Sequence, residues 1–152
     1  MFDDLRDLYQ EVILDHGRKP RNFGPLPGAN REAHGHNPLC GDKLDVHLKM
    51  HDGIVEDVKF EGAGCAISVA SASLMTEALK GRTEAEAHAL FEKFHALLTG
   101  EEVFSPEQLE ELEKLAVFSG VRDYPLRVKC ATLGWHTMNA ALEQADETVV
   151  TE

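Results

Sequence analysis

The chain has 152 residues, and 15 Lys and Arg against 27 Asp and Glu give it a formal net charge of −12. This length is typical of one domain that folds on its own hydrophobic core, so a metal is not needed for folding. The negative charge disfavours nucleic acid and anionic membranes as partners, because both are bound through basic surfaces. The sequence has no apolar run of membrane-spanning length, and its acidic N-terminal segment is unlike a signal peptide. We therefore expect a cytoplasmic protein.

The first predicted element is a helix over 2–17, where apolar residues recur at helical spacing and Gly17 supplies a stop. A loop rich in Pro, Gly and Asn follows. Apolar and polar residues then alternate, which predicts a strand over 42–50, an Asp-Gly turn and a returning strand over 54–60. Segment 31–37 is predicted as a third strand at the edge of the sheet.

Small and apolar residues over 65–81 predict a central buried helix that packs closely on the sheet. Further helices are predicted over about 83–99, from a capping box of Ser105 and Gln108 to Gly120, and from about 126–128 to 145. We expect the acidic tail, about 146–152, to be frayed. The fold class is therefore α+β: a single domain over 1–152 with an antiparallel sheet of about three strands and roughly five helices packed against it.

Each of the three cysteines falls at a junction between predicted elements. Cys40 lies in a turn before a strand, Cys65 opens the central helix, and Cys130 falls in the first turns of the final helix. A helix N-terminus lowers the pKa of a thiol, so Cys65 and Cys130 are placed where the thiolate is favoured. The alternative for each cysteine is burial as a small apolar residue.

Thiolates gathered at one end of a domain bind soft or borderline metals. Three thiolates leave one position of a tetrahedral site open, and Asp42, two residues after Cys40, is the leading candidate for the fourth ligand. The alternative for Asp42 is a solvated aspartate in a turn.

Histidines are competing ligands. His136 lies six residues after Cys130, about 120° around the helix from it, which disfavours a shared site. His88, Glu92 and His95 share one helical face, and such a pattern is more typical of a solvated surface than of a chelating site.

His34 and His36 precede Cys40 closely enough to support a site there without binding the metal themselves. His47 and His51 alternate on the polar face of the predicted hairpin, and we expect both to be exposed.

Three motifs resemble those of the IscU/NifU-like iron–sulfur cluster assembly proteins: C-G-D at 40–42, G-A-G-C-A-I-S-V-A-S-A-S at 62–73 and R-V-K-C at 127–130. The N-terminal run over 8–24 extends the resemblance to essentially the whole chain. It implies that the ligands of a metal, or of a 2Fe–2S cluster if one is assembled, are Cys40, Asp42, Cys65 and Cys130.

Two features resemble the SufU branch of that family. Lys129 stands where IscU proteins carry a histidine, and a helical insertion over about 81–102 separates the second cysteine from the third. SufU-type proteins bind Zn²⁺ and take persulfide sulfur from a SufS-type cysteine desulfurase. Arg127 also fits this branch, either as a partner for a desulfurase carboxylate or as a plain surface arginine.

The resemblance implies a role in iron–sulfur cluster biogenesis, as a zinc-dependent sulfur acceptor that serves downstream assembly or acceptor proteins. If the protein is an enzyme, it is a zinc-dependent sulfurtransferase that acts as second substrate and activator of the desulfurase. We expect Cys40 to accept the sulfur, because it lies on the most flexible segment. The alternatives are a non-enzymatic scaffold that assembles a 2Fe–2S cluster on the same ligands, and a metal-stabilised interaction module.

Overall fold

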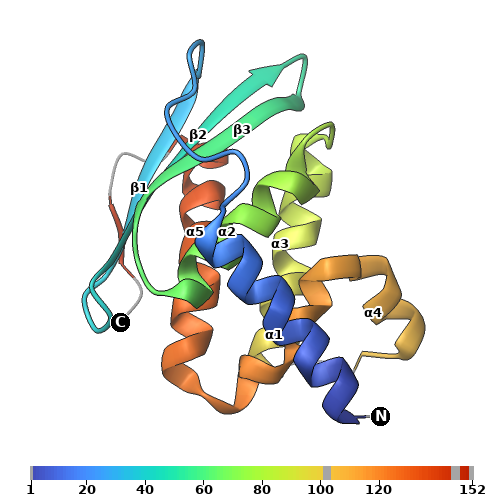
Figure 1. Cartoon of the computed structure of the whole chain (residues 1–152). Coiled ribbons are helices and arrows are strands. Elements are labelled where there is room, and N and C mark those ends of the chain that lie inside the picture. The colour runs from blue at the N-terminus through green and yellow to red at the C-terminus, as the bar shows by residue number, and fades with distance from the viewer. Residues whose placement is uncertain (1, 101–103, 145–147, 151–152) are drawn as a thin grey trace.

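The computed structural model describes residues 2–100, 104–144 and 148–150, and only the backbone of residues 2–9 and 113. Within these ranges the sheet has four strands in the order β3-β2-β1-β4. They are β1 (Arg31–Asn37), β2 (Asp42–His51), β3 (Ile54–Ala63) and β4 (Val149–Val150). β2 runs antiparallel to both β1 and β3, and β4 pairs in parallel with β1. Figure 1 shows the long β2–β3 hairpin at the upper left of the molecule.

β4 corrects two expectations about the sheet. The segment 31–37 was expected at the edge, but β1 lies between β2 and β4. The tail was expected to be frayed, yet Val149 and Val150 pair with Gly35 and His36. The apolar Val149 packs against the core, which favours pairing in an otherwise acidic segment. The rest of the predicted frayed tail lies outside the described residues, apart from Thr148.

The predicted Asp-Gly turn joins β2 to β3. Asp52 and Gly53 both have positive φ, 51° and 76°, as the turn of a two-residue hairpin requires. The two strands pair from Lys43 with Ala63 to His51 with Ile54, with one irregularity at Lys49 and Met50. The alternating pattern therefore predicted this hairpin correctly.

The helices are α1 (Phe2–Arg18), α2 (Ala66–Leu79), α3 (Glu84–Thr99), α4 (Pro106–Leu112) and α5 (Pro125–Glu143). A 3₁₀ segment, η1 (Glu113–Asp123), replaces the second half of the helix predicted to reach Gly120. Residues 115–118 of this segment are buried. The capping box of Ser105 and Gln108 is present, with Gln108 N donating to Ser105 Oγ at 3.2 Å.

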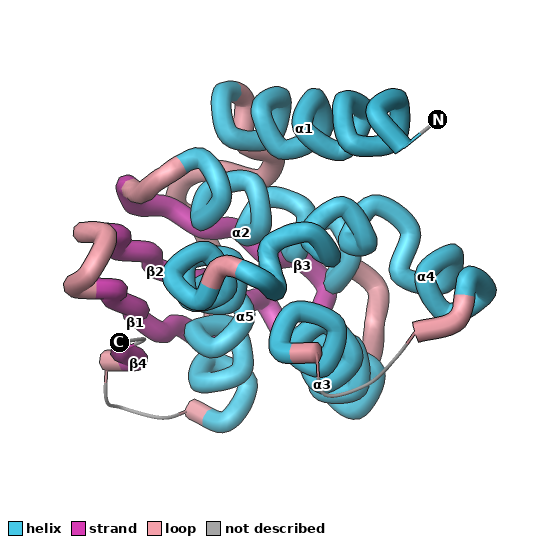
Figure 2. The backbone as a smooth tube through the Cα atoms, turned by 90° about the horizontal axis from the view of Figure 1, so that it is seen from below, coloured by secondary structure: helices cyan, strands magenta, loops and turns pink. Residues whose placement is uncertain are grey.

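The helices lie on one side of the sheet and leave its other side uncovered, as Figure 2 shows. α5 packs on β1 and β2, and α2 packs on β3. The approach of α5 is close, because a Cβ on Gly35 would lie 2.0 Å from Thr137 Oγ1. Trp135 of α5 is fully buried, and its Nε1 donates to Ser71 Oγ of α2 at 3.1 Å. These contacts set the position of α5, and with it that of Cys130.

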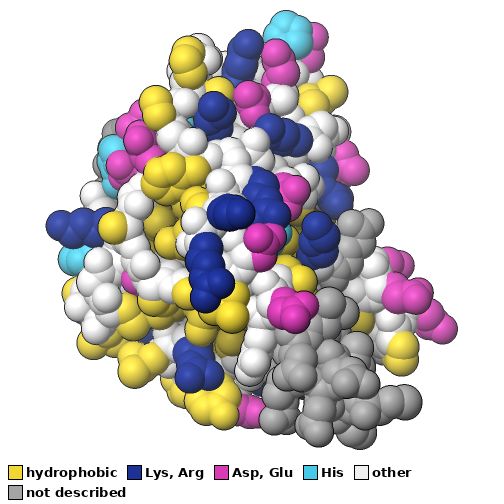
Figure 3. Space-filling view, in the orientation of Figure 1, with side chains coloured by type: hydrophobic (Ala, Val, Ile, Leu, Met, Phe, Trp, Pro, Cys, Tyr) yellow, Lys and Arg dark blue, Asp and Glu magenta, His cyan; other side chains and the backbone are white. Residues whose placement is uncertain are grey.

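Charge is unevenly distributed over the surface. Figure 3 shows Lys and Arg side chains along the middle of one face, although the net charge of the chain is −12. The helices among the described residues include none long and apolar enough to cross a membrane.

Candidate metal centre

Three of the four predicted ligands meet where the β1–β2 turn reaches α5. The donor atoms of Cys40, Asp42 and Cys130 all lie within 4.8 Å of one another. The Sγ atoms of Cys40 and Cys130 are 3.1 Å apart. Cys65 lies outside this group of three, but its Sγ is 3.8 Å from Asp42 Oδ2. The four predicted ligands therefore lie close together, with Cys65 joined to the other three through Asp42.

The β1–β2 turn separates an exposed thiol from a buried carboxylate. Cys40 is exposed in this turn, and Gly41 after it has a φ of +74°, which favours glycine. Asp42, the first residue of β2, is fully buried. The reversal at Gly41 lets two nearly adjacent residues direct their donors to one place, as C-G-D predicted.

Asp42 is held by the start of α2. The backbone N–H of Cys65 donates to Asp42 Oδ1 at 2.8 Å, which leaves Oδ2 on the side of the Cys65 thiol. A Cβ on Gly64 would lie 2.8 Å from Oδ1, so only glycine allows this approach. The sequence G-A-G-C thus positions a carboxylate as well as a cysteine.

Cys65 is the N-cap residue of α2, as predicted. Its Sγ accepts a hydrogen bond from the backbone N–H of Ser68 at 3.5 Å. This is the position at which unpaired helix amides stabilise a thiolate.

The surroundings of Cys130 differ from the prediction. The helix N-terminus was expected to favour its thiolate, but Cys130 is buried in the second turn of α5. Burial raises the pKa of the Cys130 thiol, and contacts with Cys40, Cys65 and Asp42 raise it further. Several acidic groups crowded in a buried place repel one another as anions. A divalent cation among them removes that repulsion, so the donor set fits a metal such as Zn²⁺.

Asn37 belongs to the centre and was missed from the sequence. It is fully buried at the end of β1, and its Nδ2 donates to Cys130 Sγ at 3.7 Å. Its Oδ1 accepts from the N–H of Leu39 at 3.1 Å, which closes the turn that carries Cys40. The dipeptide Asn37-Pro38 is a turn signal that would have pointed to this role.

The histidines do not join the cysteines. His34 and His36 were candidates to support the Cys40 site, but they alternate with the buried residues of β1 and face the other side of the sheet. The expectation that His47 is exposed is wrong, since it is 8% exposed between the carboxylates of Glu32 and Glu61.

The helical histidines also lie apart from the cysteines. His136 was predicted to point away from Cys130, and its ring packs against Phe91 and His95, at centroid distances of 5.1 and 5.6 Å. His88, Glu92 and His95 do not form a chelating group, because Cys40, Asp42 and Cys130 are the only three such donors gathered within the described ranges.

Arg127 lies three residues before Cys130. Its guanidinium stacks on the ring of Tyr124 at 4.5 Å. This contact holds a positive charge on the exposed start of α5.

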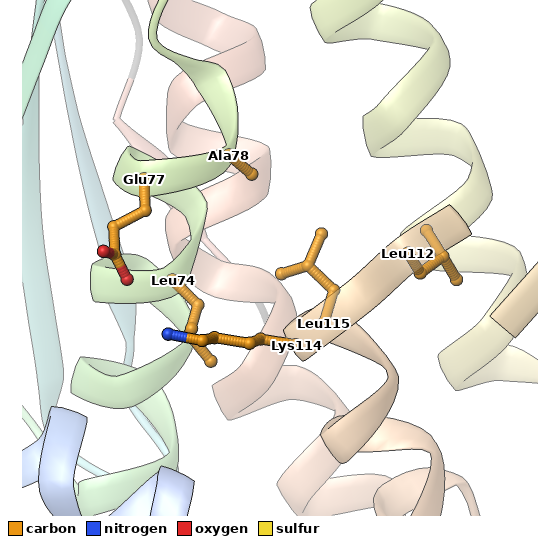
Figure 4. Close-up of a pocket in the computed structure, with 6 residues that line it drawn as sticks. All are labelled: Leu74, Glu77, Ala78, Leu112, Lys114 and Leu115. Atoms are coloured by element: carbon orange, nitrogen blue, oxygen red, sulfur yellow. The ribbon is translucent and has the colours of Figure 1, made fainter. Parts of the chain in front are cut away.

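A pocket elsewhere in the structure is separate from the metal centre. It has a volume of about 160 Å³ and lies between α2 and the region where α4 meets η1. Figure 4 shows Leu74, Ala78, Leu112 and Leu115 around it, with Glu77 and Lys114. Leu74 is nine residues along α2 from Cys65, roughly 13 Å at the rise of an α-helix. The pocket is therefore not part of the cysteine site.

The molecule is thus an α+β domain that gathers three cysteines and an aspartate at one end of its sheet, a thiolate-rich group that could hold a metal ion. Residues 8–131 match the model of the NifU-like N-terminal domain. The chain belongs to this family, as its three cysteine motifs predicted.

Individual relatives agree with this assignment. The chain is 39% identical over 143 residues to the zinc-dependent sulfurtransferase SufU of Bacillus subtilis, covering 94% of this chain and 95% of the relative. It is 38% identical over 141 residues to the iron–sulfur cluster assembly scaffold protein IscU of Streptococcus pyogenes, covering 93% and 86%.

A solved structure from Fervidobacterium islandicum, described as a putative iron–sulfur cluster assembly scaffold protein for the SUF system, superposes with a TM-score of 0.80. It is 34% identical and covers 90% of this chain and 98% of that one. The resemblance to IscU/NifU-like proteins of the SufU branch is therefore confirmed.

Proposed function

We propose that this protein acts in iron–sulfur cluster assembly as a zinc-dependent sulfur acceptor, which takes persulfide sulfur from a cysteine desulfurase. The observation that carries the proposal is the pairing of an exposed thiol, Cys40, with the buried Cys130 at 3.1 Å. Cys65 is exposed as well, whereas Cys130 and Asp42 are buried. Exposed thiols in a four-ligand set suit sulfur transfer better than hydrolysis, which needs an open metal position for water. The name of the Bacillus subtilis relative, a zinc-dependent sulfurtransferase, supports the same role.

In this proposal Cys40, Asp42, Cys65 and Cys130 are the ligands of Zn²⁺. Bound zinc keeps the thiols deprotonated at neutral pH and protects them from oxidation. Three thiolates and one carboxylate around the ion would have a formal charge of about 2 − 4 = −2. The Asn37 amide and the N–H groups of Cys65 and Ser68 donate into this negative centre and stabilise it.

Cys40 is the proposed sulfur acceptor. Its thiolate attacks the outer sulfur of the persulfide on the desulfurase cysteine, and a new S–S bond forms at Cys40 Sγ. The S–S bond of the desulfurase persulfide breaks, and its electron pair stays on the desulfurase cysteine, which leaves as a thiolate. The proton of the persulfide is lost to solvent or stays on the transferred sulfur. No external oxidant or reductant is required, because the outer sulfur passes from one cysteine to another.

The surface beside Cys40 suits a protein partner, which we take to be a SufS-type desulfurase. Leu39 next to Cys40 is 59% exposed, and Tyr124 and Leu126 at the start of α5 are 51% and 55% exposed. These side chains lie on the β1–β2 turn and on the start of α5, the two segments that meet at the cysteine site. On α5, Arg127 follows Leu126 and precedes Cys130. We place the reaction in the cytoplasm, where a reducing environment favours free thiols such as these three.

A desulfurase assay tests the proposal with two variants that each lose one proposed ligand. Only Cys40→Ala also loses the proposed acceptor, so Asp42→Ala is its matched control. We expect the zinc-loaded wild type to stimulate alanine release from cysteine and to gain the mass of one sulfur atom. Asp42→Ala should retain the added sulfur, and Cys40→Ala should lose both effects. Persulfide uptake by Cys40→Ala would contradict the proposal.

Elemental analysis and an absorption spectrum separate this role from that of a scaffold. Stoichiometric zinc and a colourless protein support the sulfur acceptor. A brown protein that contains iron and sulfide, and passes its cluster to an apo-protein, would instead support assembly of a 2Fe–2S cluster on the same ligands.

A further inference from the structure

The thiols of Cys40 and Cys130 form a close pair whose redox chemistry the sulfur-transfer role does not use. Their Sγ atoms are 3.1 Å apart, although the two residues are 90 positions apart in the chain. The S–S bond of a disulfide is about 2.05 Å long, so the two sulfurs need to approach by only about 1 Å to form one. The pair therefore stands close to the geometry of a covalent bond.

The two thiols differ in how firmly the fold holds them. Cys40 is exposed in the β1–β2 turn, next to Gly41 with its φ of +74°. Cys130 is 3% exposed in the second turn of α5, and Asn37 Nδ2 donates to its Sγ at 3.7 Å. The remaining approach therefore falls to the exposed turn, because a shift of Cys130 would move α5 within the core.

Cys65 is exposed as well, but it is held apart from the pair. Its Sγ accepts from the N–H of Ser68 at 3.5 Å and lies 3.8 Å from Asp42 Oδ2. It does not belong to the group of Cys40, Asp42 and Cys130, whose donor atoms all lie within 4.8 Å of one another. The geometry therefore favours a bond between Cys40 and Cys130 over any bond to Cys65.

We propose that Cys40 and Cys130 form a reversible disulfide when the centre holds no zinc, and that this bond keeps zinc out until it is reduced. The proposal rests on the assignment of both thiols as zinc ligands in the proposed function, and it adds a redox control of the same centre. Thiolates bind a metal, whereas the sulfurs of a disulfide carry no negative charge. The bond therefore removes two of the four proposed ligands at once, and Asp42 and Cys65 alone are too few for a closed zinc site.

The oxidant in this proposal is a peroxide such as hydrogen peroxide. The sulfur of Cys40 attacks one peroxide oxygen, the O–O bond breaks, and the other oxygen leaves as water with the thiol proton, so that Cys40 becomes a sulfenic acid. The sulfur of Cys130 then attacks Cys40 Sγ, the S–O bond breaks, and the S–S bond forms as a second water leaves. The two thiols lose two electrons, and the peroxide is reduced to two molecules of water. A small dithiol reverses the change by thiol–disulfide exchange and is itself oxidised to a disulfide.

Treatment of zinc-free protein with hydrogen peroxide tests the proposal. We expect the wild type to lose the mass of two hydrogen atoms and peptide mapping to join Cys40 to Cys130. Its zinc affinity should fall by more than about 100-fold, because two ligands are lost, and dithiothreitol should restore it. Zinc-loaded protein should form the bond at least about tenfold more slowly, because bound thiolates are protected from oxidation.

Two variants separate the pair from the third cysteine. Cys65→Ser is the matched control, since it also removes one proposed ligand but keeps the pair, and it should form the same disulfide. Cys130→Ser should instead stop at a sulfenic acid on Cys40, which dimedone labels.

Four results would overturn the proposal. The first is a main product in which Cys65 is joined to either of the other cysteines, and the second is a main product that joins two copies of the chain. The third is oxidation of Cys40 to a sulfinic acid without an S–S bond in the wild type. The fourth is oxidised protein that binds zinc as tightly as the reduced protein. None of these readouts involves a desulfurase, so their outcome is separate from that of the sulfur-transfer assay.

Discussion

At the scale of single residues, Asn37 connects the shape of the β1–β2 turn to the cysteine centre. One end of its amide closes the turn through the N–H of Leu39, and the other end donates to Cys130 Sγ. The side chain is fully buried, so it cannot exchange either partner for water. One amide group therefore links the turn that carries the exposed thiol of Cys40 to the buried thiol of Cys130.

Replacement of Asn37 by Asp keeps the shape and the acceptor for Leu39 but turns the donor toward Cys130 into an oxygen. We expect zinc affinity to fall by roughly 10- to 100-fold, because a negative oxygen would face a thiolate. Competition with a chromophoric chelator measures the loss. If Asn37→Asp binds zinc as tightly as the wild type, the amide does not support the centre.

Replacement of Asp42 by Ala removes a proposed ligand and leaves the N–H of Cys65 without its acceptor. We expect faster zinc loss and faster alkylation of Cys40 in the zinc-loaded protein, because a three-ligand site holds its thiolates less well. The rate of iodoacetamide modification measures this. Glu56→Ala, which removes an exposed carboxylate on β3, is the control and should leave the rate unchanged. Slower alkylation in Asp42→Ala would contradict the assignment.

At the scale of elements, α1 supports the helix that carries Cys65. His16 near the end of α1 is 2% exposed, and its Nδ1 lies 2.7 Å from Ser73 Oγ of α2. The N–H of Arg21, just beyond α1, donates to the same hydroxyl at 2.8 Å. Because Arg21 uses the oxygen as an acceptor, the Ser73 hydroxyl is free to donate to His16. When the hydroxyl donates to Nδ1, the ring of His16 accepts in its neutral form.

Acidification should weaken this junction. Burial lowers the pKa of His16, and the nearby charge of Arg21 lowers it further. A histidine with a lowered pKa stabilises the fold above its unfolded pKa, and this contribution is lost as pH falls toward the pKa of the folded state. We expect the urea midpoint to drop between about pH 7.5 and about pH 5.5. The drop should be smaller in His16→Gln, whatever the absolute stability of that variant, and as large in His51→Asn as in the wild type. An equal drop in His16→Gln would exclude His16 as its cause.

Most elements were predictable because their signals are local. Alternation marked the β2–β3 hairpin, and a capping box marked the start of α4. The change to 3₁₀ geometry at Glu113 was not predictable, because the apolar spacing there fits an α-helix. β4 was missed because two residues carry too weak a pattern without the neighbouring strand.

At the scale of the whole molecule, the packing of α5 on the sheet sets the distance between Cys130 and Cys40. The closest approach is at Gly35, where an added Cβ would lie 2.0 Å from Thr137 Oγ1 and 3.1 Å from Leu133 Cδ1. Any side chain at this position would push α5 away from β1. Overall stability and the geometry of the metal centre therefore depend on the same contact.

Gly35→Ala should destabilise the fold by about 1–3 kcal/mol and also weaken zinc binding, because α5 must shift to relieve the overlap. Urea unfolding and chelator competition measure the two effects. Adding Thr137→Ala to Gly35→Ala should restore part of the stability and part of the zinc affinity, because it removes the oxygen that the new Cβ meets. Gly120→Ala is the control, because a Cβ there has no atom within 4 Å. Unchanged stability in Gly35→Ala would mean that the contact does not limit the approach of α5.

The fold class, the hairpin, the helix starts and the four residues proposed as metal ligands were all predictable from the sequence. These features follow from periodicity, capping and short motifs, which act between residues close together in the chain. Three features depend instead on how the chain packs: Cys130 is buried while Cys40 is exposed, Asn37 joins the centre, and His34 and His47 share one carboxylate. The physical reason is distance along the chain: Asn37 and Cys130 are 93 residues apart, and their contact exists only because α5 packs on β1.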